Sequence, residues 1–293
     1  ALDVPEISIF QELLNGTGAR EISTTMAYVR LLTILTKDKS IGKHVVPIIP
    51  DEARTFGMDP LFRQLGIYSH KGQLYDPVDS DQFLYYKEVQ NGQILEEGIN
   101  EAGAISSFIA AGMSYSTHGV KMIPFYIYYS MFGFQRVWDL IWAAGDMRVR
   151  GFLLGGTAGR TTLNGEGLQH QDGHSHLAAA ATPNIKAYDL AYAYEIATIV
   201  HHGMKEMCQD DKDVIYYLTL ENENYTHQPM PEGVADDIIK GLYKIHATEN
   251  PTLRLLGSGP LMGEVLAAAE LLKKDWHIEP GIWNVTSFSE LRR

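Results

Sequence analysis

The sequence predicts an α/β protein built on a doubly wound parallel sheet. Between residues 93 and 220, short apolar runs alternate with longer amphipathic stretches in a regular order. Such alternation is typical of strands joined by crossover helices, which make neighbouring strands parallel. The length of 293 residues and the hydrophobic content of 45% are sufficient to cover both faces of the sheet with packed side chains.

The expected elements follow one another with few interruptions. The first helix is expected to begin after Ser23, a capping residue, and to end near Lys37. A strand is expected at residues 45–50, and residues 59–81 are expected to be irregular. The later strands are expected at residues 93–99, 121–129, 151–156, 184–189 and 214–220, and the helices at residues 100–116, 132–144, 174–181 and 192–207.

A polar segment with two prolines, residues 221–233, predicts a domain boundary. We therefore expect a first domain at residues 1–230 and a second at residues 231–293. The second contains a strand near residues 253–259, a helix at 260–274 and a strand at 281–288. Since about 60 residues are too few for a stable α/β domain, this part is expected to be an incomplete second α/β domain that continues beyond Arg293.

Composition excludes several classes of protein. The formal net charge is −12 and no basic run occurs, which argues against nucleic-acid binding. No segment approaches the roughly 20 apolar residues of a membrane helix, so no membrane contact is expected. The single cysteine, Cys208, cannot form an intrachain disulfide. A reducing compartment, the cytoplasm, is therefore the expected location.

The densest group of polar side chains lies in a glycine-rich segment, residues 159–176. It contains three histidines within seven residues, His170, His174 and His176, together with Glu166 and Asp172. One hypothesis is a metal-dependent hydrolase in which the histidines bind the metal. Another is a histidine that transfers protons beside a backbone that approaches a ligand closely. The spacing leaves both open, and the second and third histidines also suit helix capping or packing.

Other candidate site residues follow predicted strands. Glu101 opens a helix rich in alanine and glycine, although a first-turn glutamate can simply face the helix dipole. Asp51 and Glu52 end the strand at residues 45–50, where they could also form an ordinary surface ion pair. Tyr129 and Phe132 come where a strand ends, so they could stack on a planar ligand.

Long segments of the chain resemble one enzyme family. These segments are IPDEARTFGM, QILEEGINEAGA, MIPFYIYYSMFGFQR, GRTTLNGEGLQHQDGHSH and ENENY. Together they are similar to the homodimeric, bacterial-type decarboxylating component of pyruvate dehydrogenase, a thiamine-diphosphate enzyme of the transketolase-like superfamily. The resemblance covers essentially the whole chain. It implies the middle, aminopyrimidine-binding domain and the start of the C-terminal domain of a three-domain subunit.

The resemblance also implies roles for individual residues. Glu101 matches the glutamate that hydrogen-bonds a ring nitrogen of the aminopyrimidine, which favours the imino tautomer. Phe132 matches the ring that stacks on the aminopyrimidine, and Tyr129 matches a neighbour in the same pocket. His170 matches a histidine on the substrate side, suited to bind a carboxylate or to move protons. Supporting positions in or around this pocket are matched by Glu166, Asp51, Glu52 and Arg136.

The implied reaction is oxidative decarboxylation of pyruvate, with transfer of the acetyl group to a lipoyl group on a partner acyltransferase. The implied cofactors are thiamine diphosphate and magnesium. The family holds magnesium with a Gly-Asp-Gly motif followed by an asparagine, and Gly145-Asp146-Met147 is the nearest approach to it.

That motif is therefore expected in an N-terminal domain preceding Ala1, with the active site completed by a second copy of the subunit. Alone, the chain is expected to bind the cofactor weakly and to be inactive. A further hypothesis is a non-catalytic module for dimerisation or docking.

Overall fold

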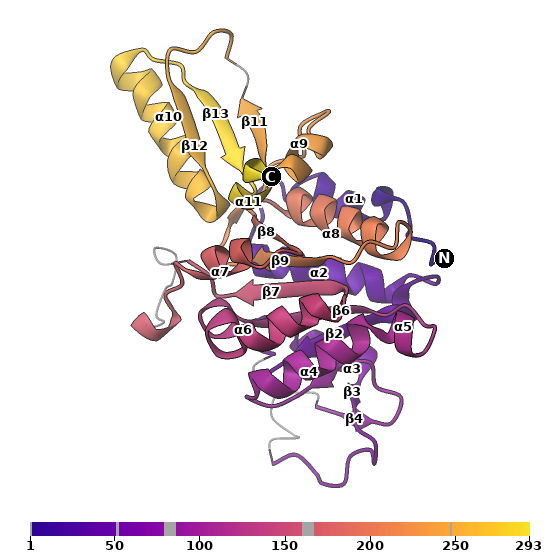
Figure 1. Cartoon of the computed structure of the whole chain (residues 1–293). Coiled ribbons are helices and arrows are strands. Elements are labelled where there is room, and N and C mark those ends of the chain that lie inside the picture. Colours follow the sequence, from indigo (N-terminus) through magenta and orange to yellow (C-terminus); the bar gives the residue numbers. More distant parts are fainter. Residues whose placement is uncertain (1, 51–52, 79–85, 160–166, 247) are drawn as a thin grey trace.

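A six-stranded parallel sheet forms the centre of the chain (Figure 1). The computed structural model describes residues 2–50, 53–78, 86–159, 167–246 and 248–293. In spatial order the strands are β5 (Leu95–Glu96), β2 (Val45–Ile49), β6 (Ile123–Tyr129), β7 (Gly151–Gly156), β9 (Ile215–Thr219) and β8 (Ile185–Asp189), and every neighbouring pair is parallel. The predicted doubly wound parallel sheet is confirmed.

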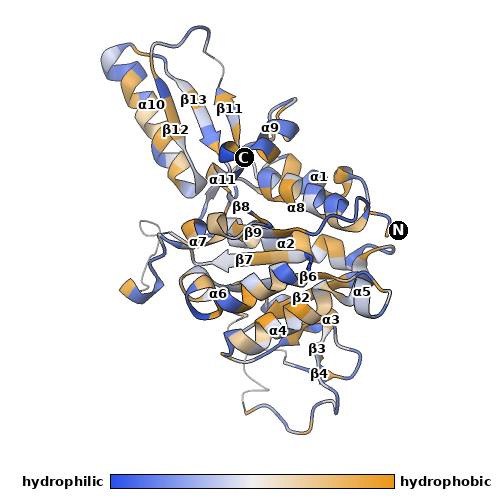
Figure 2. Cartoon of the chain, in the orientation of Figure 1, coloured by the Kyte–Doolittle hydropathy of each residue, from blue (hydrophilic) through white to orange (hydrophobic). Residues whose placement is uncertain are grey.

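Helices cover both faces of this sheet, as Figure 1 shows. One face carries α1 (Gln11–Leu14), α2 (Thr24–Lys37) and α8 (Ala193–Cys208), and the other carries α4 (Glu101–Gly112), α6 (Ser130–Asp146) and α7 (Ser175–Ala181). Each face has its own cluster of buried apolar side chains. In Figure 2 the hydrophobic residues gather on these strands and helices, whereas the long loops near β3 and β4 are mainly hydrophilic.

Capping residues fix where the helices begin. The Ser23 hydroxyl accepts a hydrogen bond from the Met26 backbone N–H at 3.1 Å, so α2 begins where the sequence predicts. The Asn100 side chain caps α4 in the same way. The helix expected at residues 100–116 is interrupted at Met113, after which α5 (Ser114–Thr117) follows.

The expectation that residues 59–81 are irregular is wrong for their first part. This segment begins with α3 (Asp59–Leu65) and continues into β3 (Ile67–Tyr68), which pairs in parallel with β4 (Glu88–Val89). Pro60 lies in the first turn of α3, where a residue without a backbone N–H costs no helical hydrogen bond. The proline was therefore a signal for the start of a helix.

The C-terminal part forms a separate three-stranded sheet (Figure 1). The expected elements are present as β12 (Arg254–Gly257), α10 (Met262–Trp276) and β13 (Gly281–Val285). The sequence did not predict β11 (Leu242–His246), which runs antiparallel to β13. The short elements around them are β1 (Glu21–Ile22) paired with β10 (Tyr225–Thr226), α9 (Ala235–Lys240) and α11 (Phe288–Arg292). The domain boundary near residue 230 stays a prediction.

A buried carboxyl group joins the C-terminal sheet to α8. Glu195, in the first turn of α8, accepts hydrogen bonds from the backbone N–H groups of Ala191 and Tyr192 at 2.7 and 3.2 Å. It also accepts from the Tyr243 hydroxyl of β11 and, at 2.5 Å, from the Asn284 side chain of β13. Two strands of the C-terminal sheet are thus bonded to one side chain of the central unit.

Candidate active site

The predicted site residues meet where the strand order reverses. From β2 the chain passes to the edge strand β5, then back across to β6 on the other side of β2. Open α/β sheets bind ligands at the carboxyl ends of the strands beside such a reversal. Glu101 begins the helix that follows β5, and Tyr129 is the last residue of β6. Both therefore lie at the position where this fold places a ligand.

Glu101, Arg136 and Phe132 form one contact unit. The Arg136 guanidinium donates a hydrogen bond to the Glu101 carboxylate at 2.6 Å. Its Cζ also lies 4.2 Å from the centroid of the Phe132 ring, a cation–π geometry. The Glu101 side chain is 15% exposed and the Arg136 side chain 49%. A largely buried carboxylate is thus held against an arginine that remains accessible to solvent.

His170 packs against the two aromatic rings of the same site. Its ring lies edge-on to Tyr129, with centroids 4.8 Å apart, and to Phe132, with centroids 5.4 Å apart. The centroid of the fully buried Phe56 ring lies 5.2 Å from that of Tyr129. Phe56 belongs to the segment DEARTFGM. From the sequence, only the carboxylates of this segment were candidates for the site, and the aromatic ring was not predicted.

The close approach of α6 to β6 depends on Gly133. A Cβ atom at this position would lie 2.0 Å from the Tyr128 ring, so only glycine lets the first turn of α6 contact the strand. Val137 has non-helical dihedral angles and kinks α6 directly after Arg136. The turn that carries Phe132 and Arg136 is therefore set by the strand beneath it rather than by the rest of the helix.

Three predicted site residues, Asp51, Glu52 and Glu166, lie outside the described residues. The structure brings together Glu101, Tyr129, Phe132, Arg136 and His170, and the roles predicted for all eight residues stay predictions.

Asp172, His174 and His176 of the histidine-rich segment make contacts of their own. Asp172 caps α7, because its carboxylate accepts hydrogen bonds from the backbone N–H groups of His174 and Ser175, both at 3.0 Å, and from the Ser175 hydroxyl. Burial would raise the pKa of Asp172, but these hydrogen bonds outweigh it and lower the pKa. His174 occupies the N-cap position of α7, but its side chain makes no capping hydrogen bond. His176 packs as expected, with Nε2 at 3.0 Å from the Thr219 hydroxyl.

The hypothesis of a metal-dependent hydrolase requires the three histidines to bind one metal ion. Among the described residues, no three His, Cys, Asp or Glu side chains are grouped so that they could hold a metal ion. His170 packs on aromatic rings, whereas His176 bonds to Thr219 at the end of β9. Among all the residues that the structure describes, no helix is both long enough and apolar enough to cross a bilayer.

A cavity of about 360 Å³ lies beside this segment, between the carboxyl ends of β7, β8 and β9 and the C-terminal sheet. Asp189, the last residue of β8, is hydrogen-bonded there to Thr219 and to Ser258, each at 2.7 Å. The cavity is lined by Ala158, Gly159, Asp172, Gly173, His174, Ser175, His176, Asp189, Thr219, Glu221, Ser258 and Leu261. Sequence analysis missed Asp189 and Thr219, although polar residues that end strands are the signal to look for.

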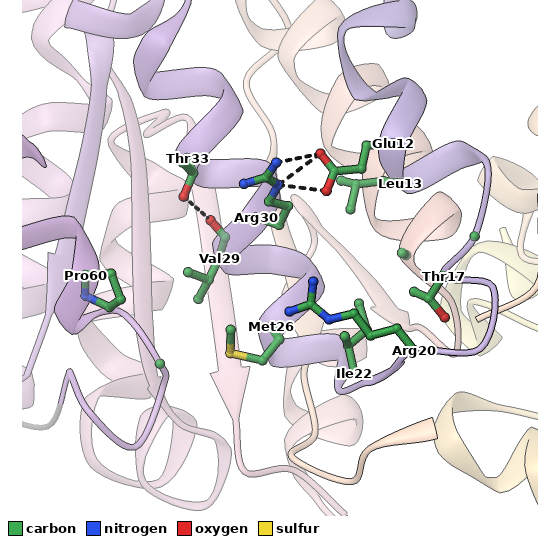
Figure 3. Close-up of a pocket in the computed structure, with 13 residues that line it drawn as sticks. Glu12, Leu13, Thr17, Arg20, Ile22, Met26, Val29, Arg30, Thr33 and Pro60 are labelled. Carbon is green, nitrogen blue, oxygen red and sulfur yellow. Dashed lines mark hydrogen bonds and ion pairs between the residues drawn. The ribbon is translucent and has the colours of Figure 1, made fainter. Parts of the chain in front are cut away.

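A larger groove of about 460 Å³ lies along α2 (Figure 3). Arg30 pairs with Glu12 at 2.7 Å on its rim, and both side chains are more than half exposed. Such a pair contributes little to stability. Met26 and Ile22 form part of its apolar wall. Of the predicted site residues that the structure describes, none lines this groove.

Comparison with known proteins identifies the family. The profile described as "Pyruvate dehydrogenase E1 component middle domain" matches residues 2–228. The chain belongs to that family. Proteins named pyruvate dehydrogenase E1 component from Cupriavidus necator, Pseudomonas aeruginosa and Escherichia coli K12 are 61%, 58% and 55% identical to it, each over 100% of the chain. The chain spans about a third of the length of these relatives, 33–34%.

Solved structures of transketolases share the fold. A transketolase from Campylobacter jejuni has a TM-score of 0.73 over 97% of this chain and 38% of its own, at 15% identity. A transketolase from Leishmania mexicana has a TM-score of 0.74 over 97% of this chain and 37% of its own, also at 15% identity. At this identity the likeness concerns the fold, and it confirms the transketolase-like architecture that the resemblance implied.

Proposed function

We propose that the chain forms the aminopyrimidine-binding third of a thiamine-diphosphate-dependent pyruvate dehydrogenase. The observation that carries the proposal is the contact unit of Glu101, Arg136 and Phe132 at the strand-order reversal between β2 and β6. It supplies a carboxylate for a ring nitrogen and an aromatic face for a planar ring. The name shared by the relatives supports pyruvate as the substrate.

The described residues fit the aminopyrimidine part of the cofactor. Phe132 is half-buried, and Arg136 covers one face of its ring. We assign the stacking of a planar ligand to the Phe132 ring and the hydrogen bond to the edge of that ligand to the Glu101 carboxylate. No set of acidic and histidine side chains that could hold magnesium occurs among these residues. We accordingly assign magnesium and the diphosphate to another part of the longer protein.

Each residue of the site has a defined task under this proposal. Bound thiamine diphosphate supplies a thiazolium that takes up electrons when a 2-oxo acid loses carbon dioxide. Glu101 holds a proton at the hydrogen bond to the pyrimidine nitrogen, and Phe132 orients that ring. His170 binds the substrate carboxylate or moves a proton on the substrate side. Tyr129 holds the imidazole by its edge-on contact at 4.8 Å and helps to exclude water.

The proposed partners follow from the same assignment. They are a second copy of the subunit, which completes the active site, the N-terminal domain that carries the magnesium motif, and a lipoyl acyltransferase that accepts the acetyl group. Cys208 is buried and burial raises the pKa of its thiol to about 11, so it is suited to packing rather than to nucleophilic chemistry. With this one cysteine, we place the protein in the cytoplasm.

The test is a chimera in which this chain replaces the matching third of the Cupriavidus necator relative. Glu101→Gln is expected to lower kcat for pyruvate decarboxylation by about 10²-fold or more, the contribution of a positioned proton-transfer group. Glu264→Gln is the matched control, because Glu264 is also a first-turn helical glutamate but lies on α10 of the C-terminal sheet. It is expected to leave kcat unchanged.

The same measurement distinguishes the non-catalytic module. Such a module would assemble with the rest of the enzyme, and its activity would be indifferent to Glu101→Gln. Equal activity of the Glu101→Gln and Glu264→Gln proteins would therefore overturn the catalytic assignment. Isothermal titration of the 293-residue chain with magnesium thiamine diphosphate is expected to show no binding tighter than millimolar. Micromolar binding would contradict the assignment of magnesium to another part of the protein.

A further inference from the structure

Three side chains from three elements form a hydrogen-bonded line along one wall of the 360 Å³ cavity. His176 of α7 lies with Nε2 at 3.0 Å from the hydroxyl oxygen of Thr219, the last residue of β9. The Thr219 hydroxyl in turn lies 2.7 Å from the carboxylate of Asp189, the last residue of β8. We call these three residues the Asp189 relay.

The geometry of the relay fixes where the protons lie. A threonine hydroxyl has one proton to donate, and the Asp189 carboxylate can only accept it. The Tyr188 carbonyl, at 3.3 Å, is the more distant acceptor for the same hydroxyl. Nε2 of His176 must therefore be the donor to Thr219. This selects the tautomer with hydrogen on Nε2 and leaves Nδ1 of the neutral ring as an acceptor.

The C-terminal sheet holds the other end of the relay. The Ser258 hydroxyl donates to the second carboxylate oxygen of Asp189 at 2.7 Å, and the Asp189 N–H donates to the Thr286 carbonyl at 2.9 Å. Gly259 has a φ of 55°, and a Cβ atom there would approach the carboxylate to 3.0 Å. Ser258 and the backbone at Gly259 thus fix the position of the carboxylate that accepts the hydrogen bond from Thr219.

The groups that surround His176 are mainly acidic. Asp172 and His174 precede it in the chain, and Asp189 and Glu221 face the same cavity from the ends of β8 and β9. The Tyr217 ring lies 5.5 Å from the imidazole. These carboxylates disfavour an anion such as pyruvate or a phosphate, so the cavity suits a neutral or cationic group.

We propose that His176 is a further proton-handling residue, for which Asp189 and Thr219 are positioning residues. The inference rests on the proposed function, because the segment that ends at His176 also presents His170 to the aromatic rings of Phe132 and Tyr129. The step moves one proton between a neutral or cationic group in the cavity and Nδ1 of His176, and it moves no electrons.

The test uses the chimera described above and follows kcat/KM against pH. Asp189→Asn keeps an oxygen that can accept from Thr219 but removes the negative charge near the imidazole. Since the imidazolium form is then less stable, the acid side of the profile is expected to move to lower pH. Thr219→Val breaks the relay and is expected to lower kcat roughly tenfold, a small part of the range for proton-transfer groups. Thr219→Ser restores the hydroxyl and is expected to rescue kcat.

The matched control is Thr248→Val. Thr248 donates to the Pro280 carbonyl at 3.1 Å within the C-terminal part, away from the cavity, so the profile should not change. A second readout needs no cofactor: the rate at which diethylpyrocarbonate modifies His176, followed by mass spectrometry. Thr219→Val releases Nε2, so the modification is expected to be faster.

The possible failures are distinguishable. An inactive chimera with the unchanged chain contradicts the proposed function. An active chimera in which Asp189→Asn leaves the pH profile unchanged, and Thr219→Val leaves the modification rate unchanged, overturns the relay. If Thr219→Val fails to fold, the Asp189→Asn profile alone decides.

Discussion

The two ends of α8 each bury a glutamate, and the two carboxyl groups have opposite surroundings. At the amino end, Glu195 is fully buried and meets only neutral donors: two backbone N–H groups, a tyrosine hydroxyl and an asparagine amide. At the carboxyl end, Glu206 is 4% exposed and accepts hydrogen bonds from Lys186 and Lys212 at 2.8 Å and from Tyr216 at 2.5 Å.

The two pKa values differ accordingly. Burial raises the pKa of Glu195 to about 7, because its neutral hydrogen-bond donors compensate only part of the lost hydration. Burial acts on Glu206 in the same direction, but the hydrogen bonds from His202, Lys186, Lys212 and Tyr216 outweigh it and lower the pKa. The cationic partners of Glu206, for which Glu195 has only neutral counterparts, therefore favour the ionised form of Glu206.

The largest expected effect is at Glu206. Glu206→Gln leaves Lys186, whose side chain is 18% exposed, without a counter-ion, and is expected to lower the free energy of unfolding by about 3 kcal/mol. The control, Lys212→Ala, removes a partner whose side chain is 55% exposed. It should lower the free energy of unfolding by less than about 1 kcal/mol.

Urea unfolding of the 293-residue chain measures both changes. Because the pKa of Glu206 is lowered, its contribution is complete above the ordinary value of 4.5 and is lost as the pH falls below that value. The difference between wild type and Glu206→Gln should therefore shrink in acid. Equal costs for the two substitutions would contradict the distinction between the buried and the exposed lysine.

Glu195→Gln is expected to change how stability depends on pH. A raised pKa means that the folded chain binds this proton more tightly than the unfolded chain, so the contribution of Glu195 falls as the pH rises from 4.5 to about 7. Across this window, the free energy of unfolding of the variant should thus rise by about 3 kcal/mol relative to that of the wild type. Comparing the two proteins at each pH cancels other groups, including His227, whose pKa burial lowers to about 4. A difference in the free energy of unfolding between the two proteins that stays constant with pH would contradict this account.

The smallest expected effect is at Tyr243. Tyr243→Phe removes one of the hydrogen-bond donors to Glu195 and is expected to lower the free energy of unfolding by about 1 kcal/mol. The hydroxyl lowers the pKa of Glu195, so its loss should extend the pH window of the previous experiment above 7. Thermal unfolding between pH 4 and pH 9 measures the shift. A window that narrows instead would show that Tyr243 does not stabilise the ionised carboxylate.

Much of the fold could be predicted because it depends on local patterns. Ser23 is followed by a helical period, and the apolar runs that end at Tyr129 and Gly156 are bounded by helices. The strand β11 could not be found in this way, because LYKIH becomes a strand only by pairing with β13, some 40 residues later. The first turn of α3 carried a local signal, Pro60, that was overlooked.

The candidate site likewise has a part that local sequence motifs predict and a part that depends on how the elements pack together. Glu101, Phe132 and His170 are predicted from long motifs that the resemblance makes specific. The contact of Arg136 with both Glu101 and Phe132 depends on the distance between α4 and α6, which no single segment encodes. The relay of Asp189, Thr219 and His176 likewise joins the ends of two strands to a helix. Such sites arise from topology, so sequence spacing alone does not reveal them.

Gly133 ties the position of the candidate site to the packing of a helix on a strand. The Tyr128 ring occupies the space that a side chain at position 133 would need. Any larger residue there would therefore have to displace the Tyr128 ring or move α6 away from β6. Either change would shift the Phe132 ring although Glu101, Phe132 and Arg136 themselves were left in place.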